Sequence, residues 1–193
     1  YTSKEDYDTF YRITKANKQG TNWFQETFSP ASIVSHNLSV SNGGENGSSL
    51  FSLSYFDQQG SIKNTYLKRY TLRANSTYNI TDNIRIGENI SFSIRENPQI
   101  DVLNARGIIG NAFREQPIIP VYDIRGNFAG AYGQGLGNGD NPVAMEDRTK
   151  NNRGVSNRVF GNIFAEVDFL KNFTFRTRFG GEYYSSSFNS FTF

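Results

Sequence analysis

The sequence predicts an all-β protein whose antiparallel strands form part of a transmembrane β-barrel wall. Three observations support this prediction. Six segments between Ser35 and Ser187 alternate apolar and polar residues, these segments are long, and the connections between them are unequal. Turns of two to five residues recur at one end, whereas one connection runs from Asn97 to Gly154 at the other. Short turns on one side and long loops on the opposite side are typical of outer-membrane barrels.

The amino-acid composition narrows the classes of protein to which the chain can belong. Aromatic residues make up 15% of the 193 residues, with 17 Phe and 11 Tyr, and there are 18 Gly, which favours strands over helices. The net charge is +2 with both signs scattered, so no nucleic-acid partner is indicated. The absence of cysteine excludes disulfides and thiolate metal sites. No apolar run reaches the length of about 18 residues that a transmembrane helix needs.

Before the first strand, residues 1–32 are polar and aromatic without a clean period. A short helix is expected around 4–15, followed by a loop with a helical turn that leads to Pro30. Four strands then follow, joined by segments rich in Gly, Asn and Asp: 33–42, 49–57, 67–80 and 84–95.

The long connection after the fourth strand has local signals of its own. Asp101 is expected to cap a helix from Val102 to about Glu115, with Pro117 beyond its end. An extended piece at 120–122 and a turn at 126–127 precede the segment 130–139. That segment carries five glycines, so we expect a mobile loop there. The last two strands are expected at 155–169 and 173–186.

Strand length and charge placement favour lipid on one side of the strands. The third to sixth strands are about 12 to 15 residues long, against about 5 to 6 in globular proteins. Tyr70 and Tyr78 are spaced for two interfacial aromatic girdles. Glu88 is the exception on the apolar face, which either a bulge at Gly87 or a position among the lipid headgroups would explain. The other charged residues considered fall on the polar faces of their strands: Arg73, Arg85, Arg95, Glu166, Asp168, Arg176, Arg178 and Glu182.

Several motifs resemble the SusC/RagA class of TonB-dependent outer-membrane transporters. They cover the chain from about Gly20 to Tyr184 in the order found in that family: Gly20–Trp23, Asn37–Gly44, Ser52–Ile62, Lys68–Asn75, Gln116–Tyr122, Asn141–Ala144, Asn162–Val167 and Phe173–Gly180.

The resemblance implies a 22-stranded barrel with an N-terminal plug in the bacterial outer membrane, mainly in Bacteroidetes. It further implies energy from the TonB complex, a SusD-like surface lipoprotein as partner, and glycan or peptide fragments as cargo. No cofactor is implied. Because the chain lacks the parts that would form the plug and contact TonB, we expect it to be a fragment. The implied domain layout places 1–32 and 97–154 in extracellular loops and 33–96 and 155–187 in strands.

Two sets of residues are candidates for function under this resemblance. Tyr122, Phe128 and Tyr132 lie in the long outer loop and could stack on sugars or contact the lipoprotein, or else anchor the loop. The second set is expected to face the lumen, where its members could contact cargo, the plug or water: Arg73, Asn75, Arg85, Asn89, Arg176 and Arg178.

Catalytic and metal sites find little support in the sequence. Glu166 and Asp168 are two residues apart on one strand face, but as lumen charges they need no catalytic role. The single histidine, His36, excludes a multi-histidine metal site. The main alternative function is a soluble carbohydrate-binding β-sandwich. A glycoside hydrolase of that fold would need two carboxylates converging on a cleft, and no pair fits.

Overall fold

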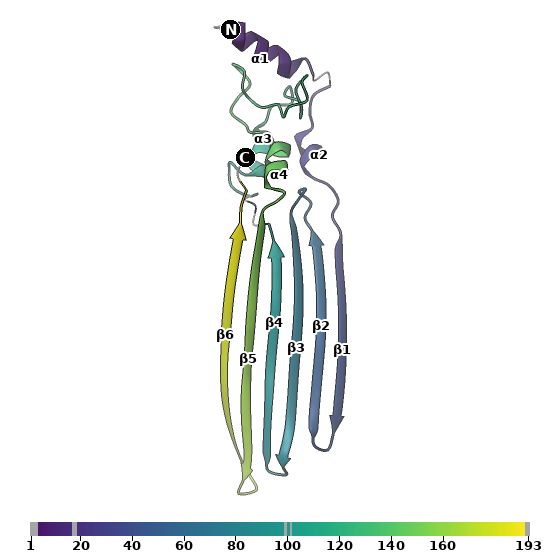
Figure 1. Cartoon of the computed structure of the whole chain (residues 1–193), viewed down its shortest axis with the longest axis vertical. Coiled ribbons are helices and arrows are strands. Elements are labelled where there is room, and N and C mark those ends of the chain that lie inside the picture. Colours follow the sequence, from purple (N-terminus) through teal and green to yellow (C-terminus); the bar gives the residue numbers. More distant parts are fainter. Residues whose placement is uncertain (1–3, 17–18, 99, 101, 192–193) are drawn as a thin grey trace.

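The six strands found among the described residues form one antiparallel sheet, in which each strand pairs with its neighbours in the sequence (Figure 1). The computed structural model describes every residue except 1–3, 17–18, 99, 101 and 192–193. The strands are β1 (Ile33–Gly44), β2 (Gly47–Gln59), β3 (Tyr66–Thr81), β4 (Ile84–Asn97), β5 (Arg153–Phe169) and β6 (Phe173–Asn189). The predicted all-β fold class with six long strands is confirmed, and the strands extend a few residues beyond the predicted limits.

The register of the sheet gives it two chemically different faces. On one face, Leu53, Leu72, Phe92 and Val159 are successive partners across four strands. On the other face, Ser52, Arg73 and Ser91 are partners across three strands. Since partners in register point to the same side, the predicted separation of apolar and charged residues is confirmed for the middle of the strands.

Glu88 stays on the apolar face. A bulge at Gly87 was one of two explanations for this carboxylate, and it is wrong, because the β3–β4 register runs unbroken through Gly87. The irregularity lies instead between Asn79 and Thr81, at the end of β3. Gly87 has a different role, since the ring of Phe164 lies over it, 2.5 Å from where a Cβ would be.

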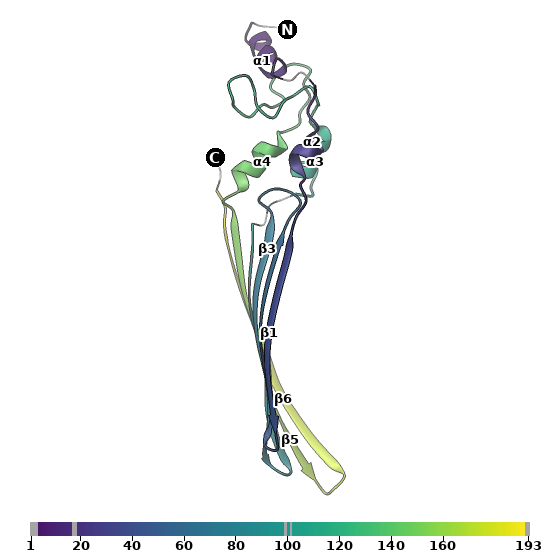
Figure 2. The ribbon, with the colours of Figure 1, turned by 90° about the vertical axis from the view of Figure 1, so that its right-hand side faces the viewer.

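Neither face of the sheet is covered by another layer of the described chain. Figure 2 shows the sheet almost edge-on and twisted, with the helices gathered at one end only. Leu38 is 66% exposed and Leu72 50% exposed on the apolar face. A β-sandwich needs a second sheet over such a face, and the described strands form one sheet, so nothing supports the soluble alternative.

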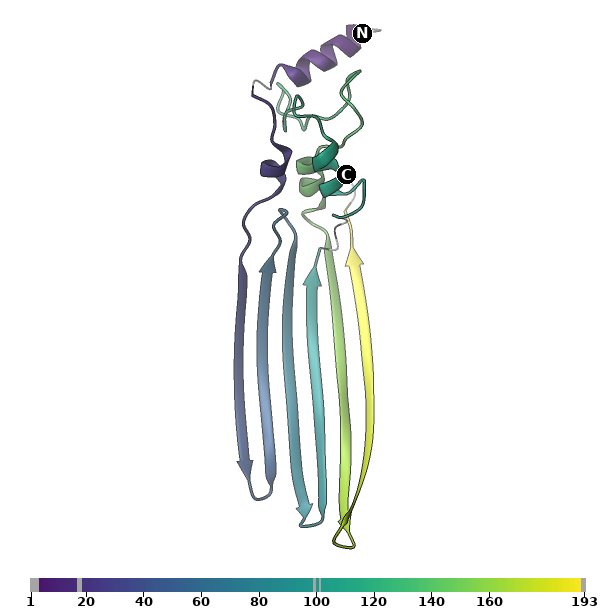
Figure 3. The same cartoon turned by 180° about the vertical axis from the view of Figure 1, so that it is seen from behind.

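The core lies beyond the loop end of the strands, in what we call the cap: the described residues of 4–32, 60–65 and 98–152 (Figure 3). Four helices belong to it: α1 (Lys4–Thr14), α2 (Trp23–Thr27), α3 (Ile108–Arg114) and α4 (Pro142–Thr149). Its buried apolar cluster contains Ile13, Trp23, Ala112, Ile119, Ala129 and Leu136. The segment 130–139 therefore packs into the core through Leu136 rather than standing apart from it.

The helix expected from Val102 is shorter than predicted and begins at Ile108. The side chain of Asn104 accepts the N–H of Arg106, and the Asn104 carbonyl accepts the N–H of Gly107. These local turn bonds compete with helical bonds over that stretch. The predicted cap residue, Asp101, lies outside the described residues. The helix α4 was not predicted, although Asn141 followed by Pro142 is a helix-start signal.

Three short turns close the opposite end of the sheet. Residues 45–46, 82–83 and 170–172 connect the strand pairs there, and Leu170 and Lys171 have positive φ. Asn79 ties the first turn to β3, because its main-chain N–H and its side chain donate to Asn46 and Glu45 at 2.9 Å each. Within the described ranges, no helix combines the length and hydropathy required to cross a membrane.

Candidate functional site

A polar hollow lies on the charged face of the sheet, in the half nearer the cap. Its volume is about 390 Å³. It is lined by three arginines and by hydroxyl and amide side chains from β1 to β5: Asn37, Ser52, Ser54, Arg69, Thr71, Arg73, Ser91, Ser93 and Arg158. Of these, only Arg73 was singled out from the sequence. Arg69 has the same strand parity as Arg73, four residues earlier, and this signal could have identified it.

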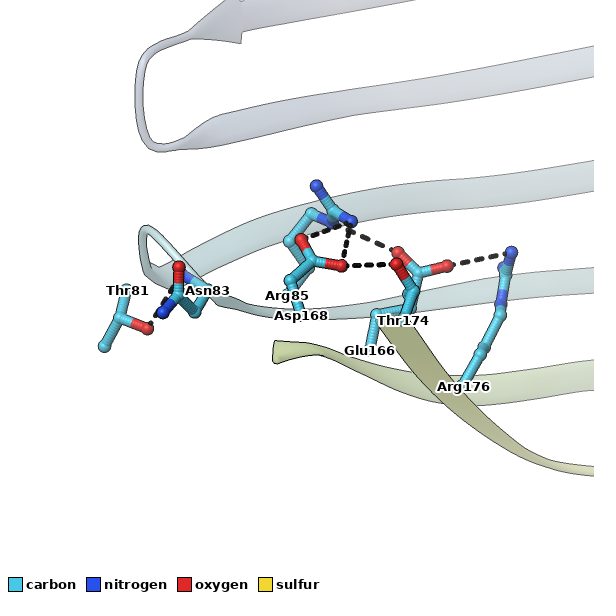
Figure 4. A network of polar contacts seen from close by, with 7 residues as sticks. All are labelled: Thr81, Asn83, Arg85, Glu166, Asp168, Thr174 and Arg176. Atoms are coloured by element: carbon cyan, nitrogen blue, oxygen red, sulfur yellow. Dashed lines mark hydrogen bonds and ion pairs between the residues drawn. The ribbon is translucent and has the colours of Figure 1, made fainter. Parts of the chain in front are cut away.

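The half of this face nearer the turns carries a closed ion-pair network (Figure 4). Arg85 contacts Glu166 and Asp168 at 3.1 Å each, and Arg176 contacts the other oxygen of Glu166 at 3.1 Å. Thr174 donates its hydroxyl to Asp168 at 2.6 Å. Glu166 and Asp168 are therefore balanced by two guanidinium groups. This is the arrangement of a structural network, not of a free acid and base.

The residues predicted to face the lumen share one face of the sheet, but they do not form one site. Asn75 and Asn89 are register partners, and Asn89 donates to Asn162 at 3.3 Å. Arg85 and Arg176 meet through Glu166, as described above. Arg178 lies in the neighbouring row, opposite Phe164.

The three aromatic residues predicted in the long loop lie close together in the cap. Tyr122 and Phe128 form an isolated β-bridge, and their ring centroids are 5.0 Å apart. Phe128 and Tyr132 line a hollow of about 340 Å³, together with Asp140 and Arg148. Tyr122 is 50% exposed and Tyr132 76% exposed, so both rings are accessible from outside.

The loop motifs noted in the sequence hold the cap together. Thr21 donates its N–H to the Pro117 carbonyl at 2.8 Å and its hydroxyl to the Ile119 carbonyl at 2.7 Å. Asn141 accepts the N–H groups of Val143 and Ala144, which caps α4. Its amide also donates to the carbonyls of Val121 and Ala129. These contacts fix the loop that carries the exposed aromatic rings.

The carboxyl groups of two buried glutamates in the cap have no hydrogen-bond partner among the described residues. Glu146 is 1% exposed and Glu115 4% exposed, and none of their four carboxyl oxygens has a partner among the described residues. Burial raises the pKa of each from 4.5 to about 7, and Asp140 adds to the effect at Glu115. Nearby cations act in the opposite direction: Arg114 lowers the pKa of Glu115, and Lys63 that of Glu146. Neither glutamate is marked by any local pattern in the sequence.

Asp123 behaves differently from these glutamates. Burial by itself would raise its pKa, but N–H groups of Asn127 and Arg125 and the charge of Arg12 outweigh this and lower the pKa. Arg12 lies 3.0 Å from Asp123 and connects α1 to the rest of the cap. Among the described residues, no group of three or more His, Asp or Glu side chains is placed to hold a metal ion. His36 instead stacks on Tyr55, with ring centroids 6.3 Å apart.

Comparison with known proteins identifies relatives with this architecture. The chain is 27% identical over 171 residues to the TonB-dependent receptor P26 of Formosa agariphila, covering 88% of this chain and 17% of the relative. It is 28% identical over 185 residues to the TonB-dependent receptor SusC of Bacteroides thetaiotaomicron, covering 84% of this chain and 18% of SusC. No family model matches the chain.

Solved structures show the same fold. The RagAB peptide importer in its closed-closed state superposes with a TM-score of 0.69 at 20% identity, covering 88% of this chain and 19% of the compared chain. The chain thus spans less than a fifth of the length of the curated relatives it matches. The chain is thus similar in sequence to TonB-dependent receptors, SusC among them, and it has the fold of a part of the RagAB structure.

Proposed function

We propose that this chain forms part of the wall and outer surface of an importer that takes up glycan or peptide fragments. The observation that carries the proposal is the two-faced, uncovered sheet with a folded cap at one end, found in a relative of TonB-dependent receptors. In this arrangement the apolar face meets lipid and the charged face meets the aqueous lumen, since hydrocarbon does not accept the charges. No covalent chemistry is required of the chain.

The proposal assigns the cap to the outside of the cell and the turns at 45–46, 82–83 and 170–172 to the periplasm. The described residues of 4–32, 60–65 and 98–152 are then outer loops, and the strands β1 to β6 belong to the barrel wall. The lumen side is the face that carries Arg73, Asn75, Arg85, Asn89, Arg176 and Arg178. Energy would come from the TonB complex.

A SusD-like lipoprotein is the proposed partner at the cap. RagAB, whose fold this chain shares, is a peptide importer, and SusC is a relative by sequence. Tyr122 and Tyr132 are exposed aromatic rings at this end of the molecule, and the half-buried Phe128 packs against Tyr122. Aromatic rings of this kind stack on sugar faces and also anchor protein interfaces. Phe128 and Tyr132 line one hollow and Tyr122 packs on Phe128, which supports a contact with cargo or with the lipoprotein.

The test uses the full-length receptor in its own bacterium. Deletion of its gene should abolish uptake of fluorescently labelled fragments prepared from the polymers on which the cells grow, and complementation should restore it. Loss of the TonB complex should have the same effect as deletion. If the deletion strain takes up every fragment at the wild-type rate, the import proposal is wrong.

The aromatic cluster is tested with Tyr132→Ala, whose ring is largely exposed. Uptake should fall while the amount of assembled receptor stays unchanged. Tyr11→Ala is a matched control, because Tyr11 is also an exposed ring of the cap, 44% exposed, but does not line the hollow. An equal loss with both variants would show that the cluster has no specific role.

A further inference from the structure

The polar face of the sheet has an uneven distribution of charge. In the half near the turns, Arg85 and Arg176 are both paired with carboxylates. In the half near the cap, Arg69, Arg73 and Arg95 have no carboxylate partner among the described residues, and all three are exposed. We call these three residues the arginine cluster. Arg158 lies on the same face of β5, in the register row between those of Arg69 and Arg73, but is paired with Glu182 at 2.7 Å.

The cluster is unfavourable when considered by itself. Arg69 and Arg95 are direct register partners, so two like charges lie opposite each other on adjacent strands. Such a pair destabilises a sheet unless an anion lies between the two groups. The ring of Phe56, 5.3 Å from the Arg69 guanidinium, offers only a cation–π contact.

The wall itself cannot supply the missing anion. The register row of Arg69 and Arg95 is completed by Ser35, Phe56, Ser156 and Ser186. The row of Arg73 reaches a carboxylate only at Glu182 on β6, three strands away, or about 14 Å at the usual strand spacing. An anion that neutralises the cluster therefore has to come from whatever occupies the space in front of this face.

The neighbouring side chains favour a polar, oligomeric ligand. Arg69, Arg73 and Arg158 line the hollow of about 390 Å³ described above, whose remaining lining is hydroxyl and amide groups. Guanidinium groups bind carboxylate or sulfate through two parallel hydrogen bonds, and hydroxyls bind the neutral parts of a sugar or peptide. Arg69 and Arg73 are about 14 Å apart along β3, which provides two places for anionic groups on one ligand.

We infer that the arginine cluster selects cargo fragments that carry repeated anionic groups, either carboxylates or sulfates. This inference rests on the proposed import function and adds a substrate class to it. The position of the cluster fits this role, because it lies in the half of the lumen face nearer the cap, where cargo enters in the proposed orientation. In the other half, Arg85 and Arg176 are held in ion pairs, and Arg178 is a single arginine without a carboxylate partner among the described residues, so no cluster of unpaired charges forms there.

The test measures equilibrium binding to the purified full-length receptor with two pairs of probes. One pair is hexaglutamate and hexaglutamine, and the other is trigalacturonate and galactotriose. At least one anionic probe should bind about tenfold more tightly than its neutral counterpart, because two charge-assisted contacts are gained. The triple variant Arg69→Gln/Arg73→Gln/Arg95→Gln should lose this preference. The corresponding triple Lys variant should keep most of it.

The matched control is Arg125→Gln. It removes the same charge from an exposed side chain of the cap, outside the cluster and outside both hollows, and should leave the preference intact. The inference is overturned if neither anionic probe is preferred, or if the preference survives the triple Gln variant. A third outcome would also overturn the inference: the triple Gln variant lowers the stability of the receptor without ligand and has no other effect. The cluster would then be paired with an acidic segment of the receptor itself.

Failure of this inference can be told apart from failure of the import proposal. Cells carrying the triple Gln variant should still take up neutral fragments at the wild-type rate while losing uptake of acidic ones. If wild-type cells take up neutral and acidic fragments equally well, only the anion selectivity is wrong. If uptake is independent of the receptor for both, the import proposal fails as well.

Discussion

Trp23 donates its indole N–H to the main-chain oxygen of Gln116 at 3.2 Å, across 93 residues of sequence. The side chain is 3% exposed and belongs to the buried cluster of the cap. This bond connects the segment before β1 to the loop between β4 and β5. The segment before β1 and the loop between β4 and β5 are therefore parts of one folded unit with its own core.

The first prediction concerns this connection. Trp23→Phe keeps an aromatic ring but leaves the Gln116 carbonyl without its donor, which should destabilise the cap by about 1 kcal/mol. Opening of the cap should then be about fivefold more frequent. The rate of protease cleavage within 98–152 of the intact receptor measures this change. Gln25→Ala, at an exposed neighbour, is the control and should leave the rate unaltered. An unchanged rate in Trp23→Phe would contradict the role assigned to the bond.

The second prediction is a pH dependence of the same unit. Burial raises the pKa of Glu115 and Glu146 to about 7, so the folded cap binds more protons than the unfolded chain between pH 4.5 and 7. Stability from these groups is therefore fully present below pH 4.5 and is lost as the pH rises through about 7. Hydrogen exchange of the cap, corrected for intrinsic rates, should show protection falling from pH 5 to pH 8.

Substitutions distinguish the effect of these two carboxyl groups on the stability of the cap from the effect of other titrating groups. Glu146→Gln removes one of them without changing its size, so protection should become higher at pH 8 and vary less with pH. Asp123→Asn is an opposite control, because the folded pKa of Asp123 is lowered and its contribution is lost as the pH falls. Protection that is independent of pH between 5 and 8 in the wild type would contradict the assignment.

The third prediction tests the first hairpin. Gly47 has a φ of +139°, and a Cβ there would collide with the Thr77 carbonyl oxygen. Gly47→Ala should therefore destabilise the β1–β3 region by about 1 to 3 kcal/mol. Its register partner Gly44 has open space around it and no positive φ, so Gly44→Ala is a matched control that should be tolerated. The fraction of receptor that assembles into a heat-modifiable barrel reports the difference, and equal yields would refute it.

The parts of the structure that the sequence could predict are those with a local period. The strands were predictable because alternation repeats at every second residue, and Leu72 and Arg73 already differ in face when only their neighbours are read. The cap was not predictable in the same way. Its helices are short, and its core joins Ile13, Trp23 and Leu136, which are far apart in the sequence. Such contacts depend on tertiary packing, which no local pattern encodes.

The candidate sites likewise combine features that a local sequence pattern predicts with features that depend on tertiary structure. The face of Arg73 followed from strand parity, whereas its grouping with Arg69 and Arg95 required the register between β3 and β4. The register is set by where the turn at 82–83 falls and by the irregularity near Asn79, and a shift of one residue would reverse the faces. Burial of Glu115 and Glu146 depends on the fold of the cap, so their raised pKa values could not be read from their neighbours in sequence.

The fourth prediction tests the assignment of the two faces to lipid and water. Leu72 and Thr71 are adjacent on β3 and point to opposite faces, with Phe92 and Ser93 as their partners on β4. If the apolar face meets lipid, Leu72→Arg places a charge in hydrocarbon, at about 2 to 4 kcal/mol near the bilayer midplane. Thr71→Arg places the same charge toward water, where salt and solvent screen its repulsion from Arg69 and Arg73, so it should assemble nearly normally.

Assembly of the full-length receptor in the outer membrane, followed by heat-modifiable migration, measures both variants. Leu72→Arg should reduce the assembled fraction, and Thr71→Arg should not. The contrast is informative because the two positions share one strand and one depth, so a general intolerance of arginine would affect both. If Thr71→Arg blocked assembly while Leu72→Arg was accepted, the faces would be reversed, and the arginine cluster could not line the lumen.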